Sequence, residues 1–126
     1  MTGLTDEQVA ELQRAYRHLI NYEGDDPIAP IDPLTYRAAD GDRLIHIAAF
    51  AGDSRTVEWL LDAGEDINAT GDMGQTPAHY AATNQHKATF DLLMSRGADT
   101  TIADEFVHTP TMTWEFFASD PKGQSA

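Results

Sequence analysis

Apolar residues near the start of the chain recur at the spacing of one helix face. Residues 5–22 carry them three or four positions apart, as Val9, Leu12, Tyr16 and Leu19. Thr5 and Gln8 have the spacing of a capping box, in which each residue's side chain satisfies the backbone N–H of the other. We therefore predict an amphipathic helix over residues 5–22, ended by Gly24.

A longer pattern repeats downstream with a period of 33 residues. Residues 41–50, reading GDRLIHIAAF, align without gaps with residues 74–83, reading GQTPAHYAAT. The Thr-Pro pair at 76–77 returns at 109–110, so a third copy begins at the same offset. A fixed period of this length is typical of a repeat architecture, in which each unit is one small helical or stranded motif.

Each repeat is expected to contain two helices. Thr76 suits the N-cap of the first helix, and Pro77 suits its first helical position. The second helix gathers apolar residues on one side, namely Val57, Leu60 and Leu61 in the first copy. Gly64 and Gly97 stand where this helix should end in a left-handed turn. Residues 68–74 would then form a hairpin that projects between repeats.

The 33-residue period, together with Thr-Pro-Ala-His-Tyr-Ala-Ala at 76–82 and Gly-Ala-Asp at 97–99, resembles the ankyrin repeat. The resemblance spans about residues 40–112. It departs from the family pattern where residues 43–44 read Arg-Leu in place of Thr-Pro, and the third copy lacks the His and the two alanines. The resemblance implies an all-α ankyrin-repeat solenoid of helix–turn–helix–hairpin units with an N-terminal capping helix, each unit burying its face against its neighbours.

On this register the chain is expected to form one ankyrin domain over residues 1–126. Its parts are an N-terminal cap (1–36), repeat 1 (37–69), repeat 2 (70–102), a partial repeat that serves as C-terminal cap (103–119), and a tail (120–126). Terminal repeats need such shielding from water. The N-terminal helix would supply it at one end, although docking of a partner is an alternative role for that helix.

The flanking segments carry smaller predictions. Residues 23–33, rich in proline and acidic residues, are expected to be a loop. A short helix is predicted from Asp32 to Ala39, with Leu34 and Tyr36 packing inward. Three aromatic residues are expected to cover the last repeat: Trp114, Phe116 and Phe117. The tail from residue 120 is expected to be disordered.

Charge narrows the partners that the chain could bind. There are 21 acidic against 8 basic residues, a formal net charge of −13, which would repel nucleic acid. The acidity either serves solubility alone or attracts a basic partner, and both remain open. The sequence has no cysteine, no apolar run of membrane-spanning length and no signal-peptide pattern at its start, so we expect a cytoplasmic protein.

No residue pattern predicts catalysis, a metal site or a cofactor. His46 and His79 lie one repeat apart, which could suggest a metal pair. The resemblance instead places both at the family's own His position, where the ring forms hydrogen bonds between hairpins. The pair Glu65-Asp66 belongs to the repeat's turn motif, and the sequence has no phosphate-binding Gly-rich loop and no nucleophile elbow.

The resemblance leaves the hairpin tips and the exposed side of each repeat's first helix for a partner, since together they line a concave groove. The positions transferred in register are Asp40, Asp42, Phe50, Asp72, Met73, Gln75, Thr83, Asn84, Glu105, Phe106 and His108. Apolar residues at exposed tips are typical of interfaces. No Lys or Arg occurs between Arg55 and Lys87, so we expect a negative groove. The alternative is that the tips are merely solvated.

These features favour a protein-binding module that blocks or sequesters one basic partner protein and is monomeric when unbound. A small acidic ankyrin protein of this kind is similar to the bacterial-type immunity proteins that neutralise secreted toxins. A non-inhibitory scaffold or adaptor is the first alternative, and an enzyme or metal-binding protein is a more distant one. A neighbouring gene for a basic toxin would separate the first two hypotheses, and turnover or bound metal would favour the third.

Overall fold

The computed structural model describes residues 3–19 and 29–118, and these ranges contain helices and turns but no strand. The elements are α1 (Asp6–Ala15), α2 (Leu44–Ala51), α3 (Ser54–Asp62), the 3₁₀ turn η1 (Asp72–Gly74), α4 (Pro77–Thr83), α5 (Lys87–Ser95) and α6 (Pro110–Ala118). The predicted all-α solenoid is therefore confirmed.

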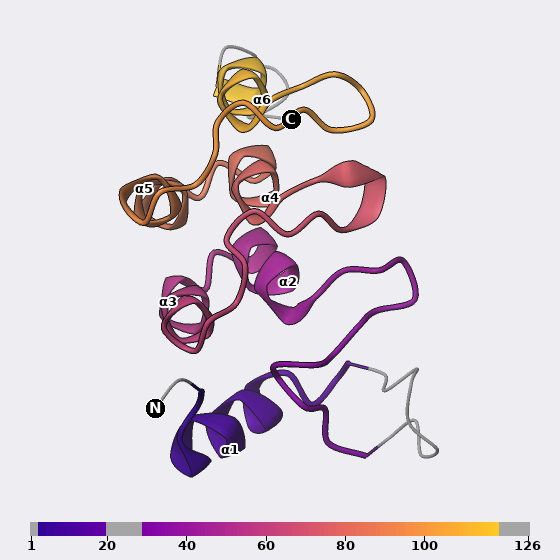
Figure 1. The fold of residues 1–126 in the computed structure, drawn as a ribbon, viewed down its shortest axis with the longest axis vertical. Coiled ribbons are helices and arrows are strands. Elements are labelled where there is room, and N and C mark those ends of the chain that lie inside the picture. Colours follow the sequence, from indigo (N-terminus) through magenta and orange to yellow (C-terminus); the bar gives the residue numbers. More distant parts are fainter. Residues whose placement is uncertain (1–2, 20–28, 119–126) are drawn as a thin grey trace.

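The helices form two parallel columns. The inner helices α2, α4 and α6 stack one above another, and the outer helices α3 and α5 stack beside them (Figure 1). The hairpins between repeats project from the side of the inner column that faces away from α3 and α5 (Figure 1). This arrangement places hairpin tips and inner helices on one common face of the molecule.

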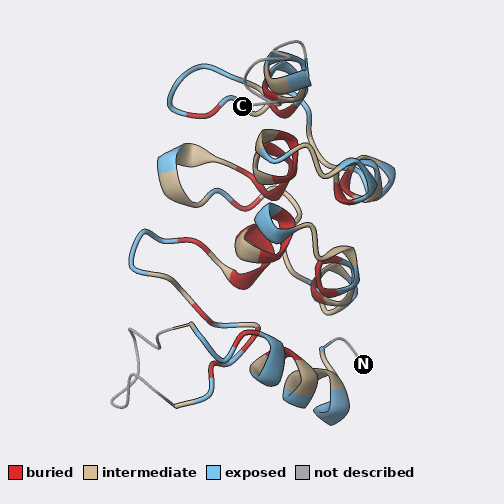
Figure 2. Cartoon of the chain, turned by 180° about the vertical axis from the view of Figure 1, so that it is seen from behind, coloured by how far each residue is buried: buried red, intermediate tan, exposed pale blue. Residues whose placement is uncertain are grey.

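Small and aliphatic residues fill the space between the columns. Leu44, Ile45 and their alanine neighbours in α2 are fully buried, as are Leu60 in α3 and Leu93 in α5. Burial follows the helix faces that meet between the layers (Figure 2). The alanines lie where α2 and α4 meet and allow these two helices to approach closely. Side chains on other faces of α2 and α4 remain available to line the groove.

The predicted helix signals of the repeats occupy their expected places. The Thr76 hydroxyl accepts a hydrogen bond from the backbone N–H of His79, and Pro77 is the first residue of α4. Gly64 and Gly97 both follow outer helices with positive φ, at 99° and 91°. Left-handed backbone at these points turns the chain from each outer helix toward the next hairpin.

The N-terminal helix is shorter than the predicted 5–22. Its capping box between Thr5 and Gln8 is present, but α1 ends at Ala15. Tyr16 leaves the helical conformation and is buried, with its hydroxyl donating to the carboxylate of Asp53 at 2.7 Å. This contact with the start of α3 competes with a further helical turn. The predicted stop at Gly24 lies outside the described residues.

The short helix predicted from Asp32 to Ala39 is wrong. The Asp32 carbonyl accepts hydrogen bonds from the N–H groups of Thr35 and Tyr36, which makes a single turn that the chain does not continue. Tyr36 nonetheless packs inward, as predicted, and Leu34 is partly buried against the same core. The chain then enters the first hairpin, in which the N–H of Ala38 donates to the carbonyl of Asp42 and the N–H of Gly41 donates to the carbonyl of Ala38.

The aromatic cover at the C-terminal end is only partly as predicted. Trp114 of α6 stacks on Phe90 of α5 with ring centroids 4.9 Å apart, which covers the last complete repeat. Phe116 instead stays 61% exposed, with Phe117 beside it. The predicted disordered tail lies outside the described residues.

Candidate functional site

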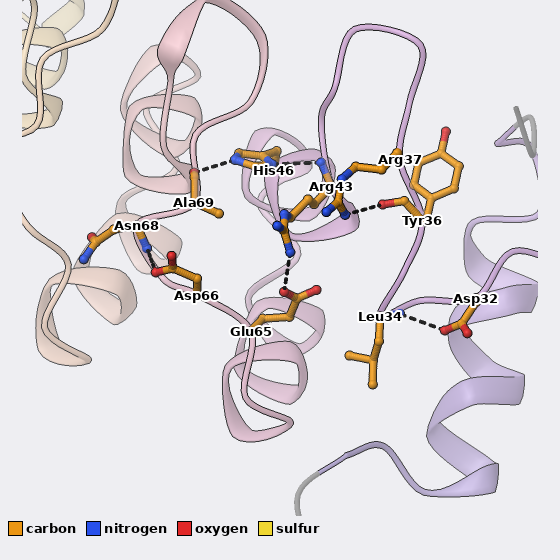
Figure 3. A network of polar contacts seen from close by, with 10 residues as sticks. All are labelled: Asp32, Leu34, Tyr36, Arg37, Arg43, His46, Glu65, Asp66, Asn68 and Ala69. Carbon is orange, nitrogen blue, oxygen red and sulfur yellow. Dashed lines mark hydrogen bonds and ion pairs between the residues drawn. The ribbon is translucent and has the colours of Figure 1, made fainter. Parts of the chain in front are cut away.

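Two buried histidines fix the hairpins to the helices. His46 accepts from the N–H of Arg43 at Nδ1 and donates from Nε2 to the carbonyl of Ala69, at 2.7 Å (Figure 3). His79 does the same one repeat later, with Nε2 at 2.8 Å from the carbonyl of His108. The predicted hydrogen bonds between hairpins are confirmed, and each ring connects one helix start to the hairpin of the next repeat.

Both imidazoles are held neutral by their surroundings. Burial lowers the pKa of His46 and of His79 below the ordinary histidine value, although the hydrogen bonds to the two carbonyls oppose this shift. A neutral ring with a protonated Nε2 provides the acceptor and the donor that each bridge requires. These buried histidines are therefore structural supports of the groove.

The hairpins share one backbone register. The N–H groups of Ala38, Gly71 and Asp104 donate to the carbonyls of Asp42, Gln75 and His108, respectively, at 2.8–2.9 Å. Adjacent hairpins are also bonded to each other, since the Glu105 N–H donates to the Met73 carbonyl. Such links hold the tips at a fixed spacing and make the groove a preformed surface.

Asp42 has a structural role, although we expected the tip residues to be available to a partner. Its side chain is buried, at 9% exposure, and its Oδ1 accepts from the Asp72 N–H at 2.8 Å. Both carboxylate oxygens also accept from the Tyr80 hydroxyl. A Cβ at Gly71 would collide with this carboxylate, so a glycine is needed there. Asp42 joins the first hairpin to the next repeat.

A mostly apolar hollow of about 310 Å³ lies against α4, between the tips of the last two hairpins and α6. We call it the apolar hollow. Its lining residues are Phe50, Met73, Gln75, Tyr80, Thr83, Asp104, Phe106, His108, Thr113, Phe116 and Phe117. Six of the residues predicted for partner binding therefore come together here: Phe50, Met73, Gln75, Thr83, Phe106 and His108.

A second hollow of about 220 Å³ adjoins the first toward the N-terminal end. We call it the acidic hollow. Its lining residues are Asp40, Asp42, His46, Ile47, Phe50, Asp72 and Tyr80. The rings of Phe50 and Tyr80 belong to both hollows and pack edge to face, with centroids 5.9 Å apart. They form the wall between an apolar and a negatively charged compartment.

Two of the predicted positions line neither hollow. Asn84 donates from its side-chain amide to the carbonyl of Phe50 at 2.8 Å, so it links two repeats. Glu105 is exposed at the last tip, where its backbone N–H is bonded to Met73. Asn84 supports the groove through Phe50, whereas Glu105 stands at its edge.

Sequence reasoning missed Tyr80, Asp104, Thr113, Phe116 and Phe117 as lining residues. Tyr80 stands inside the repeat motif, where the pattern gave no sign that its ring would face the groove. Phe116 and Phe117 were assigned to the cap over the last repeat. The available signal was that the third copy of the repeat begins at residue 109 and its pattern does not continue into a second helix, so no outer helix is predicted to pack against these two apolar residues.

Several cationic side chains of the described residues are paired with carboxylates, and, after the larger effect of burial, the nearby charges of Arg43 and Arg37 help to lower the pKa of His46. Three of them pair with nearby carboxylates, as Arg43–Glu65, Lys87–Asp91 and Arg96–Asp62, and a fourth pair joins Arg55 to Glu11. No Lys or Arg lines either hollow among the residues that the structure describes. The carboxylates of Asp40 and Asp72 therefore face the groove without a cationic neighbour in its lining.

Comparison with known proteins identifies the architecture. A family profile described as ankyrin repeats, in three copies, matches residues 11–104. The chain belongs to the ankyrin-repeat family. Ankyrin repeats are protein-interaction modules, and the groove described above is formed by the hairpin tips and inner helices of these repeats.

Relatives share only part of their length with this chain. It is 43% identical over 58 residues to Rabankyrin-5 of Mus musculus, covering 46% of this chain and 5% of that protein. It is 36% identical over 88 residues to the NF-kappa-B inhibitor cactus of Drosophila yakuba, covering 63% of this chain and 18% of that protein. The chain thus spans a small part of these curated relatives.

Within residues 3–19 and 29–118, no helix is long and apolar enough to cross a bilayer. In the same ranges, no three histidine, aspartate or glutamate side chains converge as a metal-binding group would require.

Proposed function

We propose that this ankyrin-repeat protein binds one basic partner protein in its concave groove and blocks or sequesters it. The observation that carries the proposal is the pairing of a preformed apolar hollow with an adjacent acidic one, and neither is lined by a Lys or Arg from the part of the chain that the structure describes. An apolar centre beside a charged edge is the usual composition of a protein interface.

The apolar side chains of the groove supply the binding energy in this proposal. Phe50, Met73 and Phe106 are 48%, 45% and 59% exposed, although each is large and apolar. Covering the exposed half of a phenylalanine removes roughly 100 Å² from water and contributes about 2–3 kcal/mol. A few such anchors suffice for a specific complex once the cost of association is subtracted.

Charge determines the class of partner. The net charge of −13 and the carboxylates that face the groove favour a basic protein and disfavour nucleic acid. In this proposal the protein is monomeric when unbound, performs no catalysis and needs no cofactor or metal. We place its action in the cytoplasm, because the sequence contains no cysteine to form disulfides.

Blocking the partner is the form of binding that we favour. One similar protein, of which this chain covers 18%, is named as an NF-kappa-B inhibitor, and we take that name as support for an inhibitory role. Neutralising a basic secreted toxin, as an immunity protein does, is one version of this role, and its support is the acidic groove alone. A scaffold that tethers the partner without inhibiting it is the competing role, and a partner activity assay at saturating ankyrin protein separates the two.

The experiment is capture of a partner by the immobilised full chain, followed by binding measurements on variants. Met73→Ala and Phe106→Ala should each raise the Kd at least about tenfold, because each removes an anchor worth more than about 1.4 kcal/mol. Their melting temperatures should stay close to that of the native protein. Met112→Ala is the matched control, since Met112 is 49% exposed but lines neither hollow.

A salt series gives an independent test of the charge argument. Association should slow as salt rises, because screening weakens the attraction between the acidic groove and a basic partner. Equal affinity for both anchor variants would move the interface off the hairpin tips. An association rate that does not change with salt concentration would contradict a basic partner, although the protein could still be a protein-binding module.

A further inference from the structure

The apolar and acidic hollows follow one another along the solenoid. The apolar hollow is lined by residues of α4 and α6 and by Phe50 of α2, and the helical residues that line the acidic hollow come from α2 and α4. The inner helices stack in one column (Figure 1), and packed helices lie roughly 8–10 Å apart. We therefore expect the centres of the two hollows to be separated along this column by about the same distance.

Of the three carboxylates in the acidic hollow, one is fully hydrogen-bonded within the protein and two can still accept a hydrogen bond from a partner. Asp42 is occupied by Tyr80 and by the Asp72 N–H. The Asp72 carboxylate has no hydrogen bond or ion pair within the described ranges, and Asp40 uses only Oδ1, to accept from the Asp42 N–H. Asp40 and Asp72 can therefore receive a donor from outside.

The surroundings of these two carboxylates suit a cation. The negative charges of Asp42, Asp72 and Asp40 add to burial and the Asp42 hydrogen bond in raising the pKa of Tyr80, which places all three near its hydroxyl. The rings of Tyr80 and Phe50 stand beside them. A cation over an aromatic ring gains further attraction from the ring's electrons. Carboxylates and rings together recognise a Lys or Arg side chain.

We infer that the groove binds a single extended segment of the partner, which places an apolar side chain in the apolar hollow and a Lys or Arg side chain in the acidic hollow. This rests on the proposed function and specifies its ligand. An extended or polyproline segment advances about 3.1–3.3 Å per residue, so a step of roughly 8–10 Å corresponds to three residues. In polyproline geometry, residues three apart also point in the same direction.

A random 12-residue peptide library, selected on the immobilised full chain, tests this directly. Enriched peptides should share an aromatic or large aliphatic residue and a Lys or Arg three positions away. In a synthetic peptide from this set, replacing the basic residue with Gln should raise the Kd for the native protein about fivefold. The same replacement should change the Kd for an Asp40→Asn, Asp72→Asn double variant less than twofold, because the coupled charges are already gone.

The matched control removes the same charge elsewhere. Glu7→Gln with Glu58→Gln neutralises two exposed carboxylates of α1 and α3, which line neither hollow. This variant should keep the full fivefold preference for the basic residue. The peptide replacement is read on the native protein, so its result does not depend on how any protein variant folds.

Each other outcome is also decisive. Peptides that lose binding to Phe106→Ala but show no preference for a basic residue would overturn this inference and leave the proposed function standing. The absence of any enriched peptide would overturn recognition of a single segment, while capture of a folded partner would still test the proposed function. Peptides whose Kd is unchanged by Met73→Ala and by Phe106→Ala would show that they bind outside the groove. This result would count against this inference and against the proposed function.

Discussion

The hydroxyl of Tyr80 lies 2.8 and 2.9 Å from the two carboxylate oxygens of Asp42, across the boundary between two repeats. Asp42 also accepts from the N–H of Asp72, so one buried carboxylate joins two hairpins and an inner helix. The same Tyr80 ring forms part of both hollows. Stability and the shape of the groove are therefore linked at this pair.

Tyr80→Phe should lower the free energy of unfolding by about 1–2 kcal/mol, because a buried carboxylate loses its hydroxyl donor while the ring still fills its place. Urea denaturation measured by circular dichroism checks this. Asp40→Asn, at an exposed position beside the same hollow, is the control and should change stability by less than about 0.5 kcal/mol. Equal stability of native protein and Tyr80→Phe would mean that the pair contributes nothing net.

Gly97→Val should destabilise the protein by more than about 1 kcal/mol. Gly97 has φ 91°, a region that a β-branched residue adopts only with strain. An added Cβ would meet nothing within 4 Å, so the cost comes from backbone strain and not from a clash. Thermal melts that coincide for the two proteins would contradict this explanation.

Val107→Gly should act in the opposite direction and stabilise by about 0.5–1 kcal/mol. Gly41, Gly74 and Val107 occupy the same register position in successive hairpins, with φ of 94°, 71° and 64°. Relief of left-handed strain, about 1–2 kcal/mol, outweighs the added flexibility of glycine, about 0.5–1 kcal/mol. Thermal melts measure the gain. Glu105→Gly, at an exposed neighbour with ordinary φ, should give no gain.

Acid should weaken the fold through His46 and His79. Since burial lowers both pKa values in the folded protein, the unfolded chain takes up protons that the folded protein does not. The stability is therefore fully present above about pH 6.5 and falls as the pH drops through the lowered values, by up to about 1.4 kcal/mol per pH unit for each ring.

Urea melts at pH 7.5 and pH 5.5, at one ionic strength, measure this loss. His79→Gln should lose less stability over this interval than the native protein, because one of the two proton-binding sites is gone. His18→Gln changes an exposed histidine and should retain the native pH dependence. Identical pH dependence in His79→Gln and the native protein would exclude this ring as the cause.

The repeating parts of the molecule could be predicted from the spacing of residues along the chain. The 33-residue period, the Thr76 cap, the glycine turns and the positions of His46 and His79 all appear in the structure where the pattern placed them. These features depend on contacts within a repeat or between identical positions of neighbouring repeats. Spacing along the chain reports such contacts directly.

Other features depend on contacts between elements that lie far apart in the sequence. α1 ends early because Tyr16 bonds to Asp53, the turn that starts at Asp32 ends because the first hairpin follows it, and Asp42 is buried beside Tyr80. Each of these depends on one particular pair of side chains that is not repeated in register. The apolar hollow likewise needs α6, whose Phe116 and Phe117 complete its wall. A periodic pattern carries no information about contacts that occur once, so their geometry emerged only when the repeats were stacked.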